Sequence, residues 1–353
     1  MMIARVLGSP SATPRQIASR RTIAIWLLVV CGMIAAMVVL GGLTCLTNSG
    51  LSITEWKPIH GALPPLSDAD WQEEFGAYQT IPQYERVNNG MTIDEFKNIF
   101  WWEWAHRNLG RLIGVAFLVP FLVFLFQGRI ERALLPRLVG LFVLGGMQGA
   151  LGWFMVMSGL KDRVDVSQYR LVAHLGLALT IYAAILWTAL PLWRGEWPVK
   201  GYAHPLFPWS LVVLALVSIQ ILLGGFVAGL DAGLTYNTWP LMDDKLVPDG
   251  AFPTWLAPFE DVATVQFDHR MMAYVVTAAV VALWVAGRGL PRRTRATSHA
   301  LLAAVGVQVT LGIWTLLEVV PIGLATLHQL GAVLLLTATL AHTFALRRIY
   351  EGS

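Results

Sequence analysis

Eight long stretches of the chain contain no Asp, Glu, Lys or Arg, and this feature limits the fold more than any other. They are residues 22–54, 112–128, 138–160, 171–193, 201–230, 271–287, 296–317 and 319–346. A helix of about 20 apolar residues spans the hydrocarbon core of a bilayer. Backbone groups in lipid must find partners within their own segment, so helices are expected rather than strands. We therefore predict an all-α integral membrane protein with eight transmembrane helices.

The composition supports this fold class. Hydrophobic residues make up 56% of the 353 residues and charged residues only 13%, whereas soluble domains have about 25% charged residues. This balance excludes a disordered chain, a coiled coil and an ordinary soluble enzyme. Two cysteines, Cys31 and Cys45, are too few for a disulfide framework or a cysteine-rich metal site. We expect membrane lipid around the chain and no nucleic-acid partner.

The distribution of basic residues predicts the orientation. Of the 25 Lys and Arg residues, 15 lie in the two tails and three connections, together with only three of the 22 acidic residues; these segments are 1–21, 129–137, 194–200, 288–295 and 347–353. Positively charged connections stay on the cytoplasmic side. Both termini are therefore predicted to be cytoplasmic, and the loops 44–105 and 231–268 to face outside. A bacterial inner membrane is favoured over a mitochondrial inner membrane, in which the tail 1–21 would be a transit peptide.

The two halves of the chain repeat each other. Gly41-Gly42, Gly50 and Trp56 recur as Gly224-Gly225, Gly233 and Trp239 with a constant offset of 183 residues, and Gln148–Gly152 resembles Gln308–Gly312. Each half holds four spans, so both have the same orientation and are related by a pseudo-two-fold axis along the membrane normal. We predict two pseudo-symmetric four-helix bundles, residues 22–193 and 201–346, with one similar site in each.

Four of the eight histidines occupy matching positions near the outer ends of the spans: His106, His174, His269 and His328. A single histidine in a membrane helix is commonly a packing residue, but four in duplicated register indicate a function. Zinc requires a third or fourth protein ligand, and no Cys, Asp or Glu lies near all of them. A haem iron needs only two axial ligands. We predict that His106 and His174 bind one haem and that His269 and His328 bind another.

Other polar residues are assigned with these pairs in view. Arg107 and Arg270 follow two of the histidines and suit haem propionates, although anchoring at the membrane surface explains them equally well. Haems stacked across the membrane would need histidines about 14 residues apart on two helices. Only His328 and His342 have this spacing. We interpret His204, His299 and His342 as inner-surface polar residues, and we assign no role to His60.

The repeat is broken beside one histidine. Glu103 lies three residues before His106, whereas Gln266 holds the matching position before His269. A carboxylate can transfer protons or stabilise a cation, and an amide cannot. The alternative is a solvated loop carboxylate, which the neighbouring Phe100 and Trp101 disfavour. We predict that the N-terminal half carries chemistry and the C-terminal half carries electrons.

From Ile25 to Arg347, the chain resembles the haem A synthase family. The resemblance rests on the segment Gly41–Trp56, on the element Glu103-Trp-Ala-His106-Arg107 and on the three further histidines. The segment Ile81–Met91 and the long first loop are similar to the class found in proteobacteria and mitochondria. This resemblance implies an oxidoreductase that converts haem O to haem A. Two successive hydroxylations of the C8 methyl group would give a gem-diol, which loses water to form a formyl group.

The resemblance also implies roles and partners. His106 and His174 would hold the substrate haem, Glu103 would serve its oxidation, and His269 and His328 would hold a permanent haem b that relays electrons. Haem O synthase would supply the substrate, a ferredoxin-like protein would donate electrons, and cytochrome c oxidase assembly factors would receive the product. Association of the chain into a homo-oligomer is compatible with this role. Some relatives have a cysteine pair in the first outer loop, but this loop has Cys45 alone, so no such disulfide is expected.

Two other functions compete with this interpretation. A non-enzymatic dihaem b-type electron carrier would need the four histidines but would tolerate Glu103→Gln. A transporter would also suit duplicated halves, yet the spans show no paired, charge-bearing breaks at the midplane.

Overall fold

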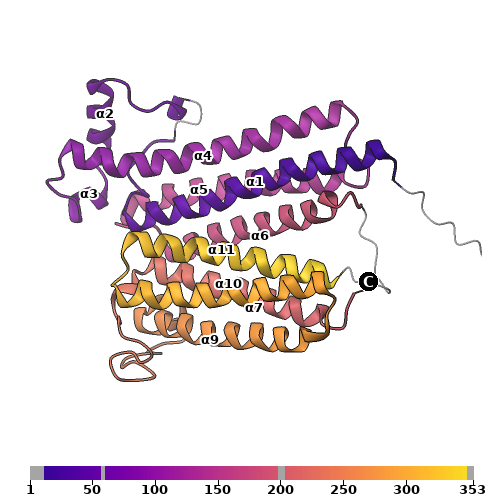
Figure 1. The fold of residues 1–353 in the computed structure, drawn as a ribbon. Coiled ribbons are helices and arrows are strands. Elements are labelled where there is room, and N and C mark those ends of the chain that lie inside the picture. The colour runs from indigo at the N-terminus through magenta and orange to yellow at the C-terminus, as the bar shows by residue number, and fades with distance from the viewer. Residues whose placement is uncertain (1–11, 57–59, 198–202, 348–353) are drawn as a thin grey trace, which may run out of the picture.

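The computed structural model describes residues 12–56, 60–197 and 203–347. Eight helices in these ranges are long and apolar enough to cross a membrane, which confirms the predicted number and the all-α class. They are α1 (Pro14–Leu46), α4 (Ile93–Phe126), α5 (Leu135–Asp162), α6 (Gln168–Trp193), α7 (Phe207–Gly229), α9 (Val262–Ala286), α10 (Arg292–Leu317) and α11 (Ile322–Leu346). They run side by side along one common direction (Figure 1). Residues 1–11 and 348–353 of the predicted tails lie outside the described residues.

The helix ends differ from the ends of the charge-free stretches, because capping determines where a helix begins. Helix α1 begins at Pro14, within the predicted tail 1–21, where Thr13 and Gln16 form a capping box. It ends at Leu46, and the following Asn48 has a left-handed φ of 51°. Helix α4 begins at Ile93 through a capping box of Thr92 and Glu95. Residues 93–105 of the predicted loop 44–105 are therefore helical and lengthen the predicted span at its N-terminal end.

Helix contacts within the first half recur within the second. Helix α1 packs against α4 and α6, and α5 packs against α4 and α6; in the same way α7 packs against α9 and α11, and α10 packs against α9 and α11. Between the halves, α1 contacts α11 and α7 contacts α6. The Gln329 amide donates to the Val38 carbonyl across this interface over 2.8 Å, and the Tyr182 and Thr337 hydroxyls are 2.7 Å apart. This arrangement is consistent with two pseudo-symmetric bundles.

A small second core covers one end of the bundle. Helices α2 (Asp68–Tyr78) and α3 (Pro82–Arg86) lie beside the N-terminal turns of α4 (Figure 1). Buried apolar side chains join them in one cluster, formed by Leu51, Phe75, Tyr78, Ile81, Phe96 and Phe100. The short elements are α8 (Ala257–Glu260) and the 3-10 turns η1 (His60–Ala62), η2 (Ala232–Leu234) and η3 (Gly287–Gly289).

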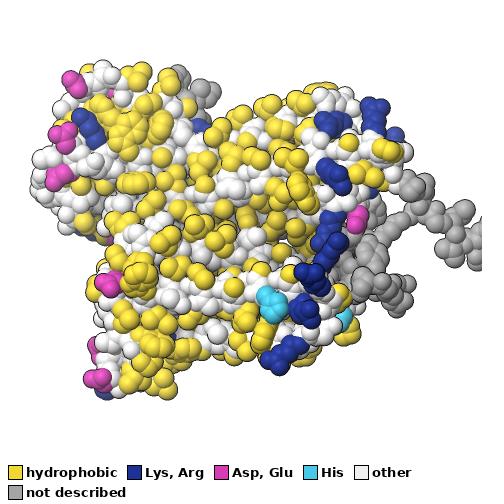
Figure 2. Space-filling view, in the orientation of Figure 1, with side chains coloured by type: hydrophobic (Ala, Val, Ile, Leu, Met, Phe, Trp, Pro, Cys, Tyr) yellow, Lys and Arg dark blue, Asp and Glu magenta, His cyan; other side chains and the backbone are white. Residues whose placement is uncertain are grey.

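Charged side chains separate between the two ends of the bundle. On the visible face, Lys and Arg gather at the end opposite α2 and α3, and most Asp and Glu lie at the α2 and α3 end (Figure 2). The predicted orientation, with the basic end toward the cytoplasm, depends on this separation.

Candidate haem-binding site

Each of the four predicted histidines packs against a glycine of a neighbouring helix. A Cβ atom added to the glycine would lie within 2.7–3.2 Å of an imidazole atom in every case, which is closer than a real side chain permits without movement. The pairs are His106 on α4 with Gly41 on α1, His174 on α6 with Gly152 on α5, His269 on α9 with Gly224 on α7, and His328 on α11 with Gly312 on α10. Both glycines of one half recur in the other half through the sequence repeat. The four imidazoles therefore occupy equivalent places in the two bundles.

The structure brings the histidines together in the predicted pairs. The side chains of His106 and His174 lie within range of direct electrostatic interaction, and so do those of His269 and His328. In the part of the chain that the structure describes, no group of three or more His, Cys, Asp or Glu side chains is arranged to hold a metal ion. Two imidazoles per bundle therefore match the ligand requirement of a haem iron and not that of zinc.

Three glutamines accompany three of the histidines. The amide nitrogens of Gln148, Gln220 and Gln308 donate to the main-chain oxygens of His174, His269 and His328 over 3.0, 3.1 and 3.0 Å. Each also lies 3.2–3.4 Å from a ring nitrogen of the same histidine. From the sequence, Gln148 and Gln308 were recognised only as markers of the repeat, and Gln220 was missed. The sequence feature that could have identified Gln220 is its polar amide inside an otherwise apolar span.

Buried polar atoms without partners test whether this site suits a haem. The amide oxygens of these three glutamines and Nδ1 of His174 are buried and have no hydrogen-bond partner among the described residues. Such atoms are rare in folded proteins and destabilise them. A histidine that binds a metal through one ring nitrogen donates its other N–H to a nearby acceptor. Unfilled acceptors beside three of the four imidazoles suit histidines that bind a haem iron, so the residues fit this group.

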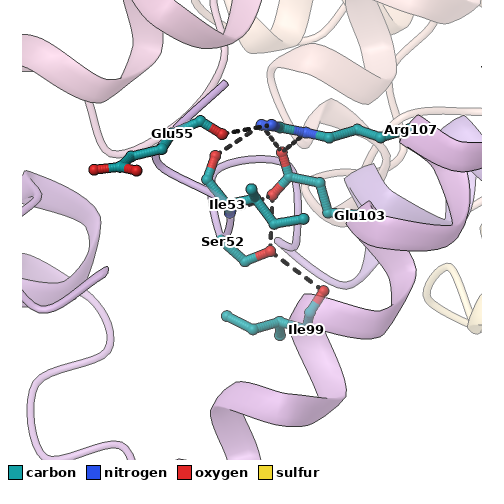
Figure 3. A network of polar contacts seen from close by, with 6 residues as sticks. All are labelled: Ser52, Ile53, Glu55, Ile99, Glu103 and Arg107. Atoms are coloured by element: carbon teal, nitrogen blue, oxygen red, sulfur yellow. Dashed lines mark hydrogen bonds and ion pairs between the residues drawn. The ribbon is translucent and has the colours of Figure 1, made fainter. Parts of the chain in front are cut away.

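Glu103 is held in a buried polar network at the outer end of α4 (Figure 3). Its side chain is only 4% exposed. One carboxylate oxygen accepts hydrogen bonds from the Ser52 hydroxyl at 2.7 Å and the Ile53 amide at 2.8 Å. The other oxygen accepts from Nη2 and Nε of Arg107 at 2.6 and 3.0 Å. These donors stabilise the ionised carboxylate, which excludes the alternative of a solvated loop residue.

Arg107 also binds the loop that follows α1, and Arg270 repeats this contact in the second half. Arg107 donates to the Ile53 oxygen at 2.7 Å and to the Glu55 oxygen at 3.4 Å. Arg270 donates to the oxygens of Tyr236 at 2.6 Å and Thr238 at 2.8 Å. Tyr236 and Thr238 follow Ile53 and Glu55 by the 183-residue offset of the repeat. Both arginines thus fasten an outer loop to the helix that carries a site histidine.

The two networks differ at the position of the carboxylate. Gln266, which replaces Glu103, donates its amide to the Tyr236 oxygen at 2.9 Å, and its own amide oxygen is buried without a partner in the described structure. Nε of Arg270 is likewise buried and unpaired among the described residues. The loop after α1 is therefore bound by an arginine and an anion, and the equivalent loop after α7 by an arginine and a neutral amide.

The remaining histidines lie apart from these pairs. His342 is buried and its Nδ1 is 2.9 Å from the Thr297 hydroxyl, and His299 accepts a hydrogen bond from Nε1 of Trp284 at 2.9 Å. Nδ1 of His204 accepts from the Leu206 amide just before α7. All three belong to the end of the bundle where the termini lie. The side chain of His60 lies outside the described structure.

Eight spans in two similar bundles, each with one imidazole pair that suits a haem iron, define a polytopic membrane protein. Sequence comparison identifies the family. The model of the cytochrome oxidase assembly protein family matches residues 24–340. The chain is 52% identical over 350 residues to the haem A synthase of Parvibaculum lavamentivorans, covering 97% of this chain and 99% of that protein. It is 50% identical to the haem A synthase of Nitrosospira multiformis, with 96% and 97% covered. The chain therefore belongs to the cytochrome oxidase assembly family that contains these haem A synthases.

Proposed function

We propose that this chain is an oxidoreductase that converts haem O to haem A. The C8 methyl group is hydroxylated twice, and the resulting gem-diol loses water to give the formyl group. Dioxygen would be the oxidant: each hydroxylation removes two electrons from the C8 carbon, and two further electrons from the external donor complete the reduction of dioxygen to water. The observation that carries the proposal is the asymmetry of two otherwise matching histidine sites, since only the N-terminal site has a buried carboxylate one turn from an axial histidine. The names of the relatives support the same reaction.

The two bundles bind different haems and have different roles. In the N-terminal bundle, residues 22–193, His106 and His174 bind the substrate haem. In the C-terminal bundle, residues 201–346, His269 and His328 bind a resident haem b, which supplies electron transfer. The contacts of α1 with α11 and of α6 with α7 bring the two bundles together.

Glu103 acts on the substrate as a fixed anion. Its four hydrogen bonds hold the carboxylate in one position before any substrate binds. A preorganised anion of this kind stabilises positive charge that develops during oxidation of the methyl group. The same carboxylate accepts a proton when the substrate carbon loses one. Ser52 and Arg107 act through Glu103 as positioning residues.

Arg107 and Arg270 bind the propionates in addition to the loops. The buried Nε of Arg270 has no acceptor among the described residues, and Arg107 makes only a long 3.4 Å contact through Nη1. These N–H groups remain for carboxylates at the membrane surface, where propionates of a haem bound by His106 or His269 would lie.

The protein acts in the bacterial inner membrane with both termini cytoplasmic. Haem O synthase supplies the substrate, a ferredoxin-like protein donates electrons on the inner side, and cytochrome c oxidase assembly factors receive haem A. The clustering of basic side chains at the end of the bundle with the termini supports this orientation (Figure 2).

The decisive experiment is haem extraction from protein purified from cells with and without haem O synthase. Haem B alone without the synthase, and haem B with haem O and haem A when it is present, is the expected result. Haem B in both cases without haem A would instead indicate an electron carrier. Absence of haem from both preparations would contradict haem binding and reopen the transporter alternative.

A further inference from the structure

Three of the four site histidines contact a glutamine amide on a neighbouring helix, and the fourth, His106, does not. An exact repeat of the two halves would give all four the same contact. Gln148 and Gln308 support His174 and His328, and Gln220 supports His269. The 183-residue offset that relates Gly41 to Gly224 also relates Met37 to Gln220. Where three histidines contact a buried amide, His106 therefore has a thioether on the equivalent turn of the neighbouring helix.

The surroundings of Met37 are adapted to it. Its terminal methyl group lies 3.3 Å from the place that a Cβ atom on Gly110 would take. Gly110 is one helical turn after His106, and the residue at the corresponding position after His269 is Ala273. The methionine therefore extends over a glycine on α4. Among the described residues, no side chain or main-chain group forms a hydrogen bond with the His106 imidazole, which packs against Gly41.

This difference affects how firmly each imidazole binds an iron. Outer contacts that orient a histidine ligand change metal affinity by about 10–100-fold when they are lost. A glutamine amide ties down the backbone of its histidine and offers an acceptor for the free ring N–H. A thioether donates no hydrogen bond and is only a weak acceptor. The His106 imidazole is therefore less constrained than the other three.

We infer that His106 is the detachable ligand of the substrate site, and that Met37 makes it so. Release of the haem begins with loss of the His106 bond and loading ends with its formation; the His174 bond breaks only after the His106 bond, and the C-terminal pair keeps both of its bonds throughout. The inference rests on the proposed function and deepens it, because an enzyme that releases its haem product needs one weak axial ligand. A haem that only relays electrons needs none, and both of its histidines contact a glutamine.

The repeat permits a reciprocal exchange as the test. Wild-type protein, Met37→Gln and Gln220→Met are purified with both sites loaded and mixed with excess apomyoglobin, and the loss of haem O, haem A and haem B is followed by chromatography. We expect Met37→Gln to slow the loss of haem O and haem A by about tenfold or more, and Gln220→Met to speed the loss of haem B by about 10–100-fold. The amount of carbon monoxide that the reduced protein binds, measured from the difference spectrum, reports the same change in axial-ligand detachment without enzymatic turnover.

Gln329→Met is the matched control. It removes a buried amide that donates to the Val38 carbonyl over 2.8 Å but contacts no site histidine by hydrogen bond, and it should leave all release rates within about twofold of wild type. Met37→Gln adds an amide and removes no hydrogen bond, so a loaded Met37→Gln protein with wild-type release rates would overturn the inference even if Gln220→Met failed to fold. Haem-free wild-type protein would overturn the proposed function and this inference with it.

Discussion

The buried Glu103 and the partly buried Arg107 form an ion pair across one turn of α4, with 2.6 Å between the carboxylate oxygen and Nη2. The same carboxylate binds Ser52 and the Ile53 amide, so the pair joins an outer loop to the helix that carries His106. Gln266 and Arg270 hold the equivalent loop without an anion. Both halves thus fasten a loop through an arginine, and the ion pair with Glu103 distinguishes the N-terminal half.

Replacing Glu103 tests whether this difference between the two halves affects catalysis. Glu103→Gln copies the second half and keeps a side chain able to bind the loop, so both haem sites should remain loaded. The rate of haem A formation should fall by about 10²–10⁴-fold, the usual contribution of a positioned acid or base. Rates are measured by chromatography of extracted haems. Loss of haem from the variant would assign Glu103 a structural role, and an unchanged rate would favour the electron carrier.

Removing the Ser52 hydroxyl should weaken catalysis without unloading the haems. A hydrogen bond to a charged group contributes about 1.5–3 kcal/mol, and about 1.4 kcal/mol corresponds to a tenfold change. We therefore expect Ser52→Ala to slow haem A formation by about tenfold or more. Ser218→Ala, which removes a hydroxyl bonded within α7 to the Leu214 oxygen, is the control. Equal losses in both variants would mean that Ser52 only stabilises the fold.

Removing the His328 imidazole should release haem b selectively. His328→Ala leaves His269 as a single ligand, because no other described imidazole shares its site, and it leaves the N-terminal pair intact. The low-spin spectrum of haem b should disappear while extracted haem O or haem A persists. A low-spin haem b spectrum identical to that of wild type would contradict this ligand assignment.

The glycine beside His328 should be nearly as sensitive as the histidine. A Cβ atom at Gly312 would lie 2.7 Å from the imidazole, whereas one at Gly306 on the same helix would meet no atom within 4 Å. Gly312→Ala should therefore displace the ring and reduce the haem b content of the purified protein severalfold. Gly306→Ala should retain haem b and gain about 0.5–1 kcal/mol of helix stability. Equal haem b content in the two variants would show that the ring tolerates displacement.

The sequence by itself determined the membrane class and the eight spans, and it singled out the four histidines that occupy equivalent places in the two halves. Charged side chains are costly in lipid, so each span appears in the sequence as a long stretch without charged residues. The duplication places four histidines at matching positions, which distinguishes them from histidines that only pack. The asymmetry between Glu103 and Gln266 was visible for the same reason. The helix ends were less accessible, since the first turns of α4 carry Asp94 and Glu95 and lie beyond the charge-free stretch.

Only the tertiary structure decided what surrounds these residues. The bond between Glu103 and Ser52 joins residues 51 positions apart, and the Gln220 contact with His269 joins residues 49 positions apart. No local pattern encodes such contacts, because they arise when separate helices pack and bring their polar side chains together out of lipid. The glycine beside each imidazole likewise acquires its meaning only when two helices approach closely. Composition and repeat therefore predict where a site lies, and packing decides which groups hold it.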